Sequence, residues 1–553
     1  MGEAREHPYI AVLKRRFADG QVDRREFLRS STLLGLSAAA AYAIAGKLAG
    51  GPAVRSAGAQ MPKGGTLRLG MAVQDVASPH TYAREGQHNV TRNVCEYLTK
   101  TGHDNVTRPC LLREWQASDD LRTWTLMLRD DVTWRSGRAF TAEDVVWNLR
   151  RVLDERTGSS VLGLMMGYML EEYQEGGATR TRLWDANAVE KVDSHTVRLN
   201  CRTPQLAVPE HLFHYPLLML DPEEGGVFGP GSNGTGAFEL VEHEVGVRSL
   251  LRAREGYWDK GPYLDQIEFL DLGDDPAATV DALGAQRVHG VHSIDVVQLE
   301  ALRLMPHLQL YDVPTADTAV VRGKVTEKPF DDPRVRQALR LAVDPTLTQQ
   351  IILGDLGLPA EHHHVSPIHP EYAPLPAMGR DIEAARRLLA EAGYPDGIDL
   401  GTIDCKSSPS WEFNAVQAIV EQWKRAGIRC KINLMPSSAF WEIWDKTTLG
   451  FTEWAHRPLG VMALSLGYRS GVPWNESGYA NPELDRLLTE AEGILDVDKR
   501  RAVMAEIERI MQEDGPIVQP VWRSVMAVMD KRVRGFRMHP TRYIFGNELA
   551  IDS

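Results

Sequence analysis

Cysteine is scarce in this sequence. The chain of 553 residues has five cysteines, and no two of them stand in a C-x-x-C pair. This low number excludes a small disulfide-stabilised scaffold, and the missing pairs exclude the usual zinc and thioredoxin-like motifs. No disulfide bridge is predicted. The cysteines are Cys95, Cys110, Cys201, Cys405 and Cys430.

The sequence also lacks an excess of basic residues. Its 62 Lys and Arg residues face 75 Asp and Glu residues, which gives a formal net charge of −13 at pH 7. A general nucleic-acid binder needs a basic surface that displaces counterions from phosphates, so no nucleic-acid partner is predicted. With 43% apolar and 25% charged residues, the chain has the composition of a large folded protein with an extensive core.

Long hydrophobic runs are missing after the first fifty residues. A membrane-spanning helix needs roughly 18 uninterrupted apolar residues, and no later segment has them. The one apolar run, 30–49, is diluted by Gly35, Ser37, Gly46 and Lys47. This dilution disfavours a permanent membrane helix and is typical of an export signal.

The N-terminus has the order of features found in a twin-arginine (Tat) export signal. The segment Asp23-Arg24-Arg25-Glu26-Phe27-Leu28-Arg29 resembles the S/T-R-R-x-F-L-K motif, despite the aspartate at its first place. The apolar run follows, and Ala57-Gly58-Ala59 then gives an A-x-A cleavage site. Residues 1–59 are therefore predicted to be a Tat signal peptide read by the Tat translocase, and the protein is predicted to be periplasmic. The alternative is a buried N-terminal helix or a retained membrane anchor.

Motifs for covalent catalysis and cofactor binding are missing or incomplete. Gly229-Pro-Gly231-Ser-Asn-Gly234 fits G-x-G-x-x-G, but a strand is predicted after it, so a glycine turn is the better interpretation. The chain has no G-x-S-x-G and no P-loop lysine, and His243-Glu244 lacks the second histidine of H-E-x-x-H. No catalytic residue, metal or cofactor is predicted. An exported enzyme on an α/β scaffold is the alternative from another class.

Apolar periodicity predicts a mixed α/β architecture in which helices flank sheets. The clearest unit is a strand at 398–404, a helix at 411–426 and a strand at 428–434. A right-handed crossover makes these strands parallel. Cys405 and Cys430 should then lie at opposite ends of the sheet, which argues against a bridge between them.

Three helix starts are marked by capping residues. Thr141-Ala-Glu-Asp144 resembles a capping box, with aspartate in place of the usual Glu or Gln. Asp332-Pro333 and Asn481-Pro482 each supply a cap followed by a first-turn proline. Helices are therefore predicted from 142, 333 and 482 onward.

Two residue groups allow a structural or a functional interpretation. The run Glu361-His362-His363-His364, with His369 nearby, could hold a transition metal, but its proline-rich surroundings favour a solvated loop at a rim. Trp441 and Trp444, three residues apart, are expected to form a helix face in the core in preference to a ligand platform.

Several blocks along the chain resemble the bacterial extracellular solute-binding proteins of family 5, the peptide, dipeptide and nickel receptors of ABC importers. Each block alone is loose, but the set stands in the order of the family and covers essentially the whole chain after the leader. The blocks lie at 124–134 with 140–146, 234–241 with 257–265, 330–339 with 342–344, and 481–485.

The resemblance implies a two-lobe periplasmic-binding-protein fold of α/β class with a hinge between the lobes. Lobe I is expected to comprise 61–105, 190–311 and 531–553, with an inserted subdomain at 106–189, and lobe II to comprise 312–530. Ligand binding then closes the lobes, and the permease subunits in the inner membrane recognise the closed form. A monomer without covalent chemistry is implied.

The predicted ligand site departs from the peptide branch of the family. In that branch an acidic residue three places after a lobe II tryptophan binds the amino terminus of the peptide. Here the tryptophan is matched by Trp454, and Arg457 occupies the acidic position. A guanidinium favours a carboxylate or phosphate through two parallel hydrogen bonds. Glu453 or Glu476 is the alternative source of the missing acid.

The remaining predicted ligand contacts lie in loops and at strand ends. Lys406 and Ser408 follow a parallel strand, where α/β sheets bind ligands. The full set adds possible stacking tryptophans and a lobe I turn: His456, Trp454, Trp411, Trp474, Asn233 and Thr235. The predicted function is to capture a small organic solute, such as a peptide or modified amino acid with an acidic group, for an ABC importer. A receptor for a metal or metal chelate is the alternative within the fold.

Overall fold

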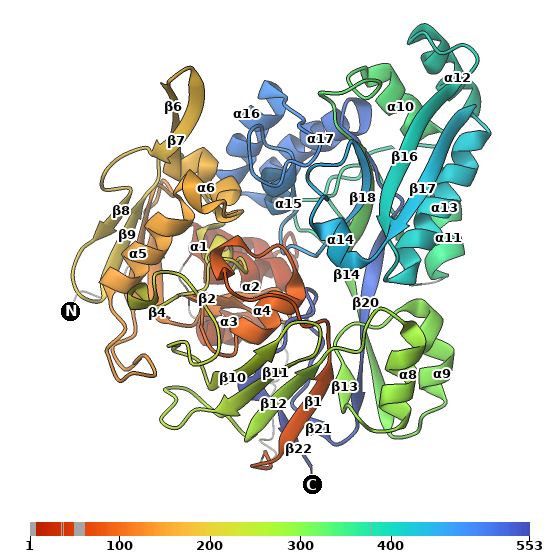
Figure 1. Cartoon of the computed structure of the whole chain (residues 1–553). Helices are drawn as coiled ribbons and strands as arrows, with labels where there is room; N and C mark the ends of the chain where they lie inside the picture. Colours follow the sequence, from red (N-terminus) through yellow and green to blue (C-terminus); the bar gives the residue numbers. More distant parts are fainter. Residues whose placement is uncertain are drawn as a thin grey trace.

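The computed structural model describes residues 7–34, 36, 38–48, 61–354, 356–376 and 378–552. Its largest feature is a 12-stranded mixed sheet that runs through the body and is flanked by helices (Figure 1). Along the main path the strands follow the order β10-β11-β12-β1-β13-β20-β14-β18-β16-β17. The predicted mixed α/β architecture is confirmed.

One half of the sheet is built around β1 (Thr66–Gly70). This strand lies parallel to β12 (Gln266–Leu270) and to β13 (Gly290–Val291). An antiparallel hairpin of β10 (Phe238–Glu244) and β11 (Arg248–Ala253) extends the sheet beyond β12. The glycine-rich turn before β10 therefore leads into a strand, as predicted, and not into a phosphate-binding helix.

Two long strands connect the halves of the sheet. β14 (Leu308–Gly323) and β20 (Val521–Asp530) pair antiparallel, with a register shift between Pro314 and Asp317. β20 also pairs with β13 in the first half, and β14 pairs with β18 (Leu449–Trp454) in the second. The predicted changes of lobe, at 311/312 and 530/531, fall within β14 and at the end of β20. The lobe limits themselves remain predictions.

The second half contains the predicted βαβ unit. β16 (Ile398–Lys406) runs parallel to β17 (Ile428–Met435), and α13 (Ser410–Lys424) connects them. Cys405 is aligned with Leu434, so it lies far along the strand from Cys430. All five cysteines of the chain are free in the structure.

A smaller four-stranded sheet lies within the predicted inserted segment. It has the order β4-β5-β9-β8, with β4 (Leu112–Ala117), β5 (Thr123–Leu128), β9 (Thr196–Asn200) and β8 (Val189–Lys191). The helix α5 (Ala142–Val152) packs beside it and begins with the predicted capping box. The Thr141 amide donates to Asp144 Oδ2 at 2.8 Å.

The other helices complete the two halves and the region between them. Asp332 and Asn481 cap α10 and α16 as predicted, because their side chains accept amides of the first turn. These helices are α4 (Glu85–Thr91), α6 (Val161–Met169), α7 (Val208–His211), α8 (Pro276–Gly284), α9 (Leu299–Arg303), α10 (Pro333–Leu341), α11 (Pro345–Leu353), α12 (Ile382–Glu391), α14 (Ser437–Trp441), α15 (Gly460–Gly467), α16 (Pro482–Glu492) and α17 (Val497–Glu513).

Short strands form small hairpins or join the edges of the main sheet. They are β2 (Thr99–Thr101), β3 (Thr107–Pro109), β6 (Leu170–Glu175), β7 (Ala178–Leu183), β15 (Gly357–Pro359), β19 (Ile517–Val518), β21 (Val533–Arg534) and β22 (Ala550–Ile551).

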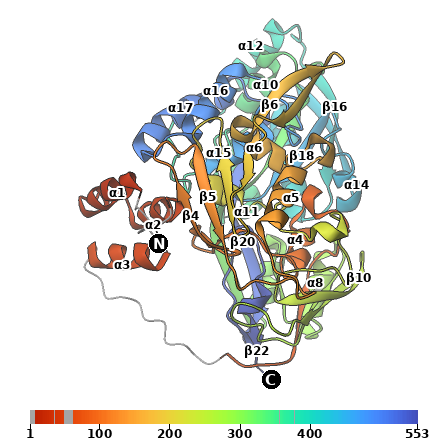
Figure 2. The same ribbon diagram turned by 90° about the vertical axis from the view of Figure 1, so that its left-hand side faces the viewer.

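The predicted leader contributes three helices that pack on the body. They are α1 (Pro8–Ala18), α2 (Arg24–Leu33) and α3 (Ala38–Leu48), and they lie on the side of the body near β4 and α17 (Figure 2). Phe27 is completely buried in the same apolar cluster as residues of the body. This packing corresponds to the alternative of buried N-terminal helices. The predicted cleavage site, ending at Ala59, lies outside the described residues.

The described part of the chain contains no helix with the length and apolar character required to cross a bilayer.

Candidate functional site

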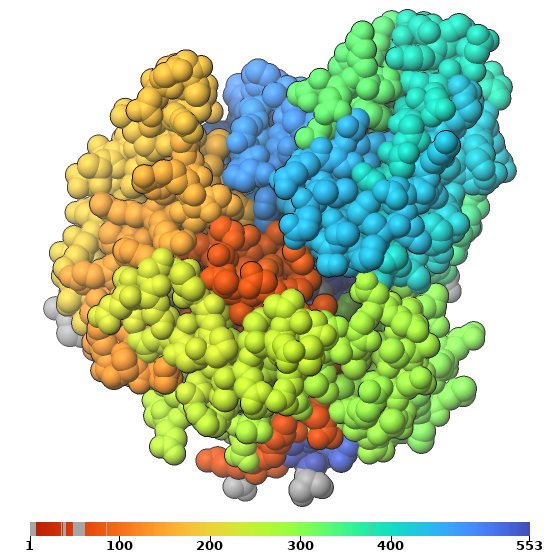
Figure 3. Space-filling model, viewed as in Figure 1, coloured from red at the N-terminus to blue at the C-terminus, as the bar shows by residue number. Residues whose placement is uncertain are grey.

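A cavity of about 230 Å³ lies between the two halves of the sheet and receives side chains from both. Its first-half wall includes Met71, Arg84, His88 and Tyr215. Its second-half wall comes from β18, α14 and the loops that follow β16 and β18. In the space-filling view the orange-red α4 segment reaches the surface between the yellow-green strands and the blue second half (Figure 3). The cavity is therefore placed where a movement of the halves would open or close it.

Four tryptophans and a tyrosine form an aromatic wall in this cavity. The ring centroids of Trp441 and Trp444 are 5.8 Å apart, and those of Trp444 and Trp474 are 6.2 Å apart. Trp474 also lies 6.0 Å from Trp454 and 5.8 Å from Tyr215. The predicted placement of Trp454 and Trp474 agrees with this wall. The expectation that Trp441 and Trp444 belong to a helix face in the core is wrong, because α14 ends at the cavity and both rings line it.

Arg457 lines the cavity just beyond β18. Its Nη1 donates to the carbonyl oxygens of Ala455 and His456, both at 3.0 Å, and its Nη2 donates to the Tyr215 hydroxyl at 3.3 Å. The guanidinium carbon lies 5.2 Å from the centroid of the Tyr215 ring. Within the described residues, Arg457 Nε has no hydrogen-bond partner and no carboxylate lies within ion-pair distance of the group. A buried cation without a countercharge therefore borders the cavity.

Glu453 also borders the cavity, but three cations surround its carboxylate. Arg542 Nη2 and Arg523 Nη2 lie 3.0 and 3.3 Å from Oε1, and Lys406 Nζ lies 3.3 Å from Oε2. Burial alone would raise the pKa of Glu453, but Lys406, Arg542 and Arg523 hold it well below its usual range. The carboxylate is therefore ionised and already neutralised, which leaves it little attraction for a ligand amine.

Glu476, the other candidate acid, does not face the cavity. Its carboxylate accepts hydrogen bonds from Arg322 Nε at 2.8 Å, from Thr452 Oγ1 at 2.6 Å and from Trp454 Nε1 at 3.0 Å. These bonds use the carboxylate inside the protein. Glu476 thus positions Trp454 from behind the aromatic wall.

Lys406, the last residue of β16, and Ser408, in the loop after it, both line the cavity. Lys406 Nζ lies 2.8 Å from Glu412 Oε1 and 4.8 Å from the centroid of the Trp441 ring. Although burial alone lowers the pKa of Lys406, the carboxylates of Glu412 and Glu453 raise it. The ammonium is therefore charged but paired, in contrast to Arg457.

His456 turns away from the main cavity. Its Nε2 lies 3.2 Å from Asn105 Oδ1, and its Nδ1 accepts the Ala316 amide at 3.2 Å. Burial, followed by His369, lowers the pKa of His456 well below its usual value, so the ring is neutral. The side chain borders a smaller neighbouring cavity of about 30 Å³, where it connects the two halves.

Trp411, Asn233 and Thr235 lie outside the residues that line the main cavity. Trp411 is buried in the core of the second half, against Phe451. The Asn233 amide donates to Ser136 Oγ at 3.1 Å and thereby fixes its own turn, and Thr235 is completely buried. The predictions for these three residues do not match their positions, because local packing uses each side chain.

The histidine run also differs from its prediction as a solvated rim. His362, His363 and His364 are almost fully buried, and burial lowers the pKa of each. His362 Nδ1 accepts the Gln519 amide at 2.9 Å, and His364 Nε2 lies 2.8 Å from the Tyr468 hydroxyl. No group of three or more His, Cys, Asp or Glu side chains suited to a metal ion occurs among the described residues.

Several cavity residues carry no signal in the sequence. Arg84, His88 and Tyr215 come from the first half, and Arg542 comes from the C-terminal segment, far along the chain from Arg457. Burial and the Arg92 guanidinium lower the pKa of His88 well below its usual value, so its ring meets the cavity as a neutral imidazole. Only the fold brings these groups together.

The sequence and the fold have counterparts among known proteins. Residues 107–470 match the middle region of the bacterial extracellular solute-binding proteins of family 5. The dipeptide-binding protein DppE of Bacillus subtilis is 24% identical over 475 residues, which cover 82% of this chain and 85% of DppE.

Two solved structures share the fold of this chain. The murein tripeptide binding protein MppA of Escherichia coli matches with a TM-score of 0.79 and 22% identity, over 89% of this chain and 99% of MppA. AgaA from A. tumefaciens R10, solved in complex with agropinic acid, matches with a TM-score of 0.77 and 21% identity, over 88% of this chain and 99% of AgaA. Both are periplasmic-binding folds, so the predicted two-lobe fold class is confirmed.

Proposed function

The chain belongs to the bacterial extracellular solute-binding proteins of family 5, and from this premise we propose that it is the substrate-binding component of an ABC importer. It captures a small organic solute with an acidic group between its lobes and delivers it to the permease subunits in the inner membrane. It acts as a monomer, and the solute is not consumed. The ligand stabilises the closed form by binding it more tightly than the open form.

The observation that carries this proposal is the unpaired guanidinium of Arg457. Its neighbours in the cavity wall are carbonyl oxygens and a hydroxyl, whereas Lys406 and Glu453 are neutralised by partners. A ligand carboxylate beside Arg457 would form charge-assisted hydrogen bonds with it. A ligand ammonium at the same place would be repelled.

The aromatic wall indicates the chemistry of the part of the proposed ligand that lies next to its acidic group. Four tryptophans line one cavity, so the ligand presents an apolar or flat portion next to its acidic group. A peptide or a modified amino acid meets both requirements. The agropinic acid complex of AgaA supports an acidic ligand for a protein of this fold.

The test compares binding by the parent protein with binding by two Arg457 variants. A thermal-shift screen of peptides, amino-acid derivatives and opines identifies a ligand, and titration calorimetry then measures its affinity. We expect Arg457→Ala to weaken binding by about 2–5 kcal/mol, because the ligand anion loses its buried partner. Arg457→Lys should restore part of this loss, since it keeps the charge but not the planar fork.

Arg113→Ala is the matched control, because Arg113 is an exposed arginine outside the cavity. Its affinity for the ligand should equal that of the parent. Equal affinity of Arg457→Ala and the parent would refute the role of Arg457, and so would a complex in which a ligand amine faces this side chain.

We also propose export through the Tat pathway with cleavage after Ala59, which places the mature protein in the periplasm. The support is the order of the twin-arginine motif, the apolar run and the A-x-A site in the sequence.

A further inference from the structure

The N-terminal helices share one continuous apolar core with the body. Phe27 and Leu33 of α2 and Ala41 of α3 are completely buried, and they belong to the same cluster as Trp115 of β4. The Trp115 indole Nε1 also donates to the Leu33 carbonyl oxygen at 2.8 Å. The indole N–H of a buried tryptophan needs a hydrogen-bond acceptor, and α2 supplies this acceptor to Trp115 of the body.

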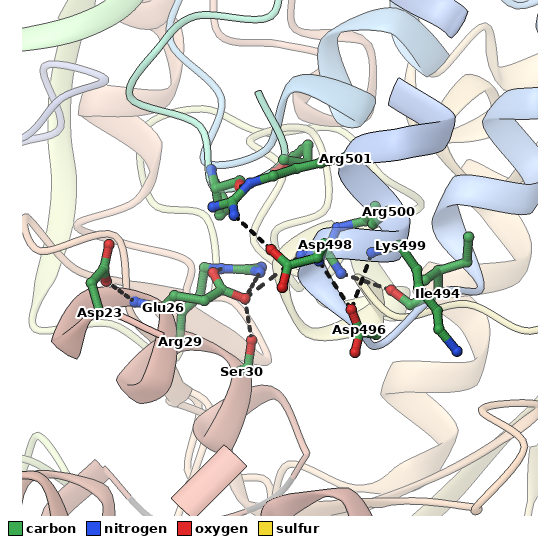
Figure 4. Close-up of polar contacts among 12 residues, drawn as sticks. Asp23, Glu26, Arg29, Ser30, Ile494, Asp496, Asp498, Lys499, Arg500 and Arg501 are labelled. Carbon is green, nitrogen blue, oxygen red and sulfur yellow. Dashed lines mark hydrogen bonds and ion pairs between the residues drawn. The ribbon is translucent and has the colours of Figure 1, made fainter. Parts of the chain in front are cut away.

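A buried charge cluster joins α2 to α17 (Figure 4), and it also includes Glu210 of α7. On α2, Arg29 holds Glu26 through two hydrogen bonds of 3.0 Å each, and Ser30 Oγ donates to Glu26 at 2.6 Å. From the body, Arg500 Nη2 lies 3.6 Å from Glu26 Oε1, and Glu210 Oε1 lies 3.8 Å from Arg29 Nη1. Each side supplies one cation and one anion. The four groups are complementary in sign across the contact when Glu210 is ionised, and burial raises the pKa of Glu210 to about 7.

The burial of this cluster is almost complete. The exposed fractions are 6% for Glu26, 3% for Arg29, 2% for Glu210 and 1% for Arg500. Charges that leave water need a partner, and across this contact the partners are ion pairs of 3.6 and 3.8 Å without a hydrogen bond. Arg16 of α1 adds a contact at the rim, because its Nη1 lies 3.0 Å from Asp496 Oδ2.

The contact divides the twin-arginine motif into two parts. Arg24 and Arg25 are exposed, whereas Phe27, Leu28 and Arg29 are buried against the body. The two arginines stand at the start of α2, and every residue from Glu26 to Leu33 is buried, so the division follows position along the helix.

We propose that α1, α2 and α3 bind the folded body of the precursor as a helical cap, through the surface formed by Trp115, Glu210 and Arg500. In the bound cap, the two arginines of the motif are exposed to solvent. The apolar residues of the motif, Phe27 and Leu28, pack against the body. The role of Arg24 and Arg25 as an export signal rests on the proposed Tat export. The binding of the cap to the body does not depend on it.

Hydrogen–deuterium exchange of the purified full-length chain tests this proposal. Amides of α2, and those of the α17 turn that carries Arg500, should both be protected. Phe27→Asp places a charge in the buried contact but leaves the body sequence intact. We expect it to speed exchange by about tenfold or more in α2 and also in the first turns of α17, because the cap separates.

Arg15→Ala is the matched control, since Arg15 is exposed on α1 and should leave both regions protected. Exchange of α2 in the parent at the rate of an unstructured segment would overturn the proposal. Unchanged protection of α17 in Phe27→Asp would overturn it too, because the cap would then make no contact with the body. Neither outcome depends on whether the Tat pathway exports the protein.

Discussion

At the scale of single residues, Glu508 is a buried carboxyl group with few hydrogen bonds to offset its loss of hydration. Its Oε1 accepts the Ala373 amide at 3.2 Å, and its Oε2 has no hydrogen-bond partner among the described residues. Burial, followed by the nearby Glu361 and Glu371 carboxylates, raises the pKa of Glu508 from 4.5 to about 9. The folded protein therefore holds a proton on Glu508 at neutral pH that the unfolded chain releases.

This difference in protonation predicts a pH-dependent loss of stability. Between pH 4.5 and about 9 the folded state binds more protons than the unfolded state, so the Glu508 contribution to the free energy of unfolding falls as pH rises. Glu508→Gln removes the titration and keeps the acceptor for Ala373. We expect the variant to be more stable than the parent by about 1–3 kcal/mol at pH 8, with the difference vanishing below pH 5.

Denaturant unfolding at several pH values measures this effect. Glu506→Gln on the exposed face of the same helix is the control and should show no such trend. A stability difference between Glu508→Gln and the parent that does not change with pH would contradict the prediction.

The cavity residues show which part of the site a sequence can supply. Arg457 and Trp454 were predicted from the family resemblance, which pairs a tryptophan with a ligand-binding position three places later, and Lys406 was predicted from the end of a parallel strand; all three line the cavity. Trp441 was misjudged, since spacing alone does not tell a core face from a cavity wall. Tyr215 could not be found, because its approach to Arg457 depends on the meeting of two halves of the fold.

At the scale of elements, the turn before β10 depends on the absence of a side chain at Gly234. A Cβ built there would lie 1.9 Å from the Val94 carbonyl oxygen, and this backbone atom cannot move aside cheaply. We expect Gly234→Ala to reduce the free energy of unfolding by about 1–3 kcal/mol. Gly229→Ala is the control, because a Cβ at Gly229 meets nothing within 4 Å.

Thermal unfolding of both glycine variants decides this point. Equal melting temperatures for Gly234→Ala and Gly229→Ala would show that the turn tolerates a side chain.

The proposed Tat export predicts how substitutions in the leader change the location of the protein. Replacing Arg24 and Arg25 together by lysine removes the guanidinium pair that defines the motif but keeps its charge. We expect the precursor of this double variant to remain inside the cell. Immunoblots of periplasmic and cytoplasmic fractions measure the outcome, with Arg15→Lys as a control outside the motif. Normal periplasmic accumulation of the double variant would exclude Tat export.

Capping residues and apolar periodicity predicted most helices and strands, but they did not predict contacts between residues distant in sequence. The caps at Thr141 and Asn481 and the βαβ unit were correct, because short-range hydrogen bonds and periodicity determine them. A buried N-terminal helix was only the alternative interpretation of the leader. The sequence could not favour it, because the burial of α2 depends on Trp115 and Arg500, which are distant in sequence.

At the scale of the whole molecule, β14 and β20 set the path of any lobe movement. They form the connection between the halves, and their pairing shifts register between Pro314 and Asp317. A register shift interrupts regular pairing, so bending is expected to concentrate there. Both halves line the cavity, so we expect it to close when the halves approach.

Small-angle scattering tests this movement. With saturating ligand the radius of gyration should decrease, because the ligand contacts both halves and stabilises the closed form. The ligand should be recovered unchanged. An unaltered radius of gyration would contradict the closure, and steady conversion of the ligand would support an enzyme instead.

The five free cysteines have a consequence for where the molecule can be assembled. Since none of them is paired, the finished fold contains no bond that depends on the redox potential of its surroundings. Burial raises the pKa of the Cys95, Cys201 and Cys405 thiols, which keeps them from forming reactive thiolates. Folding of the chain therefore needs no thiol oxidation, and the three buried thiols stay protonated in reducing and in oxidising surroundings alike.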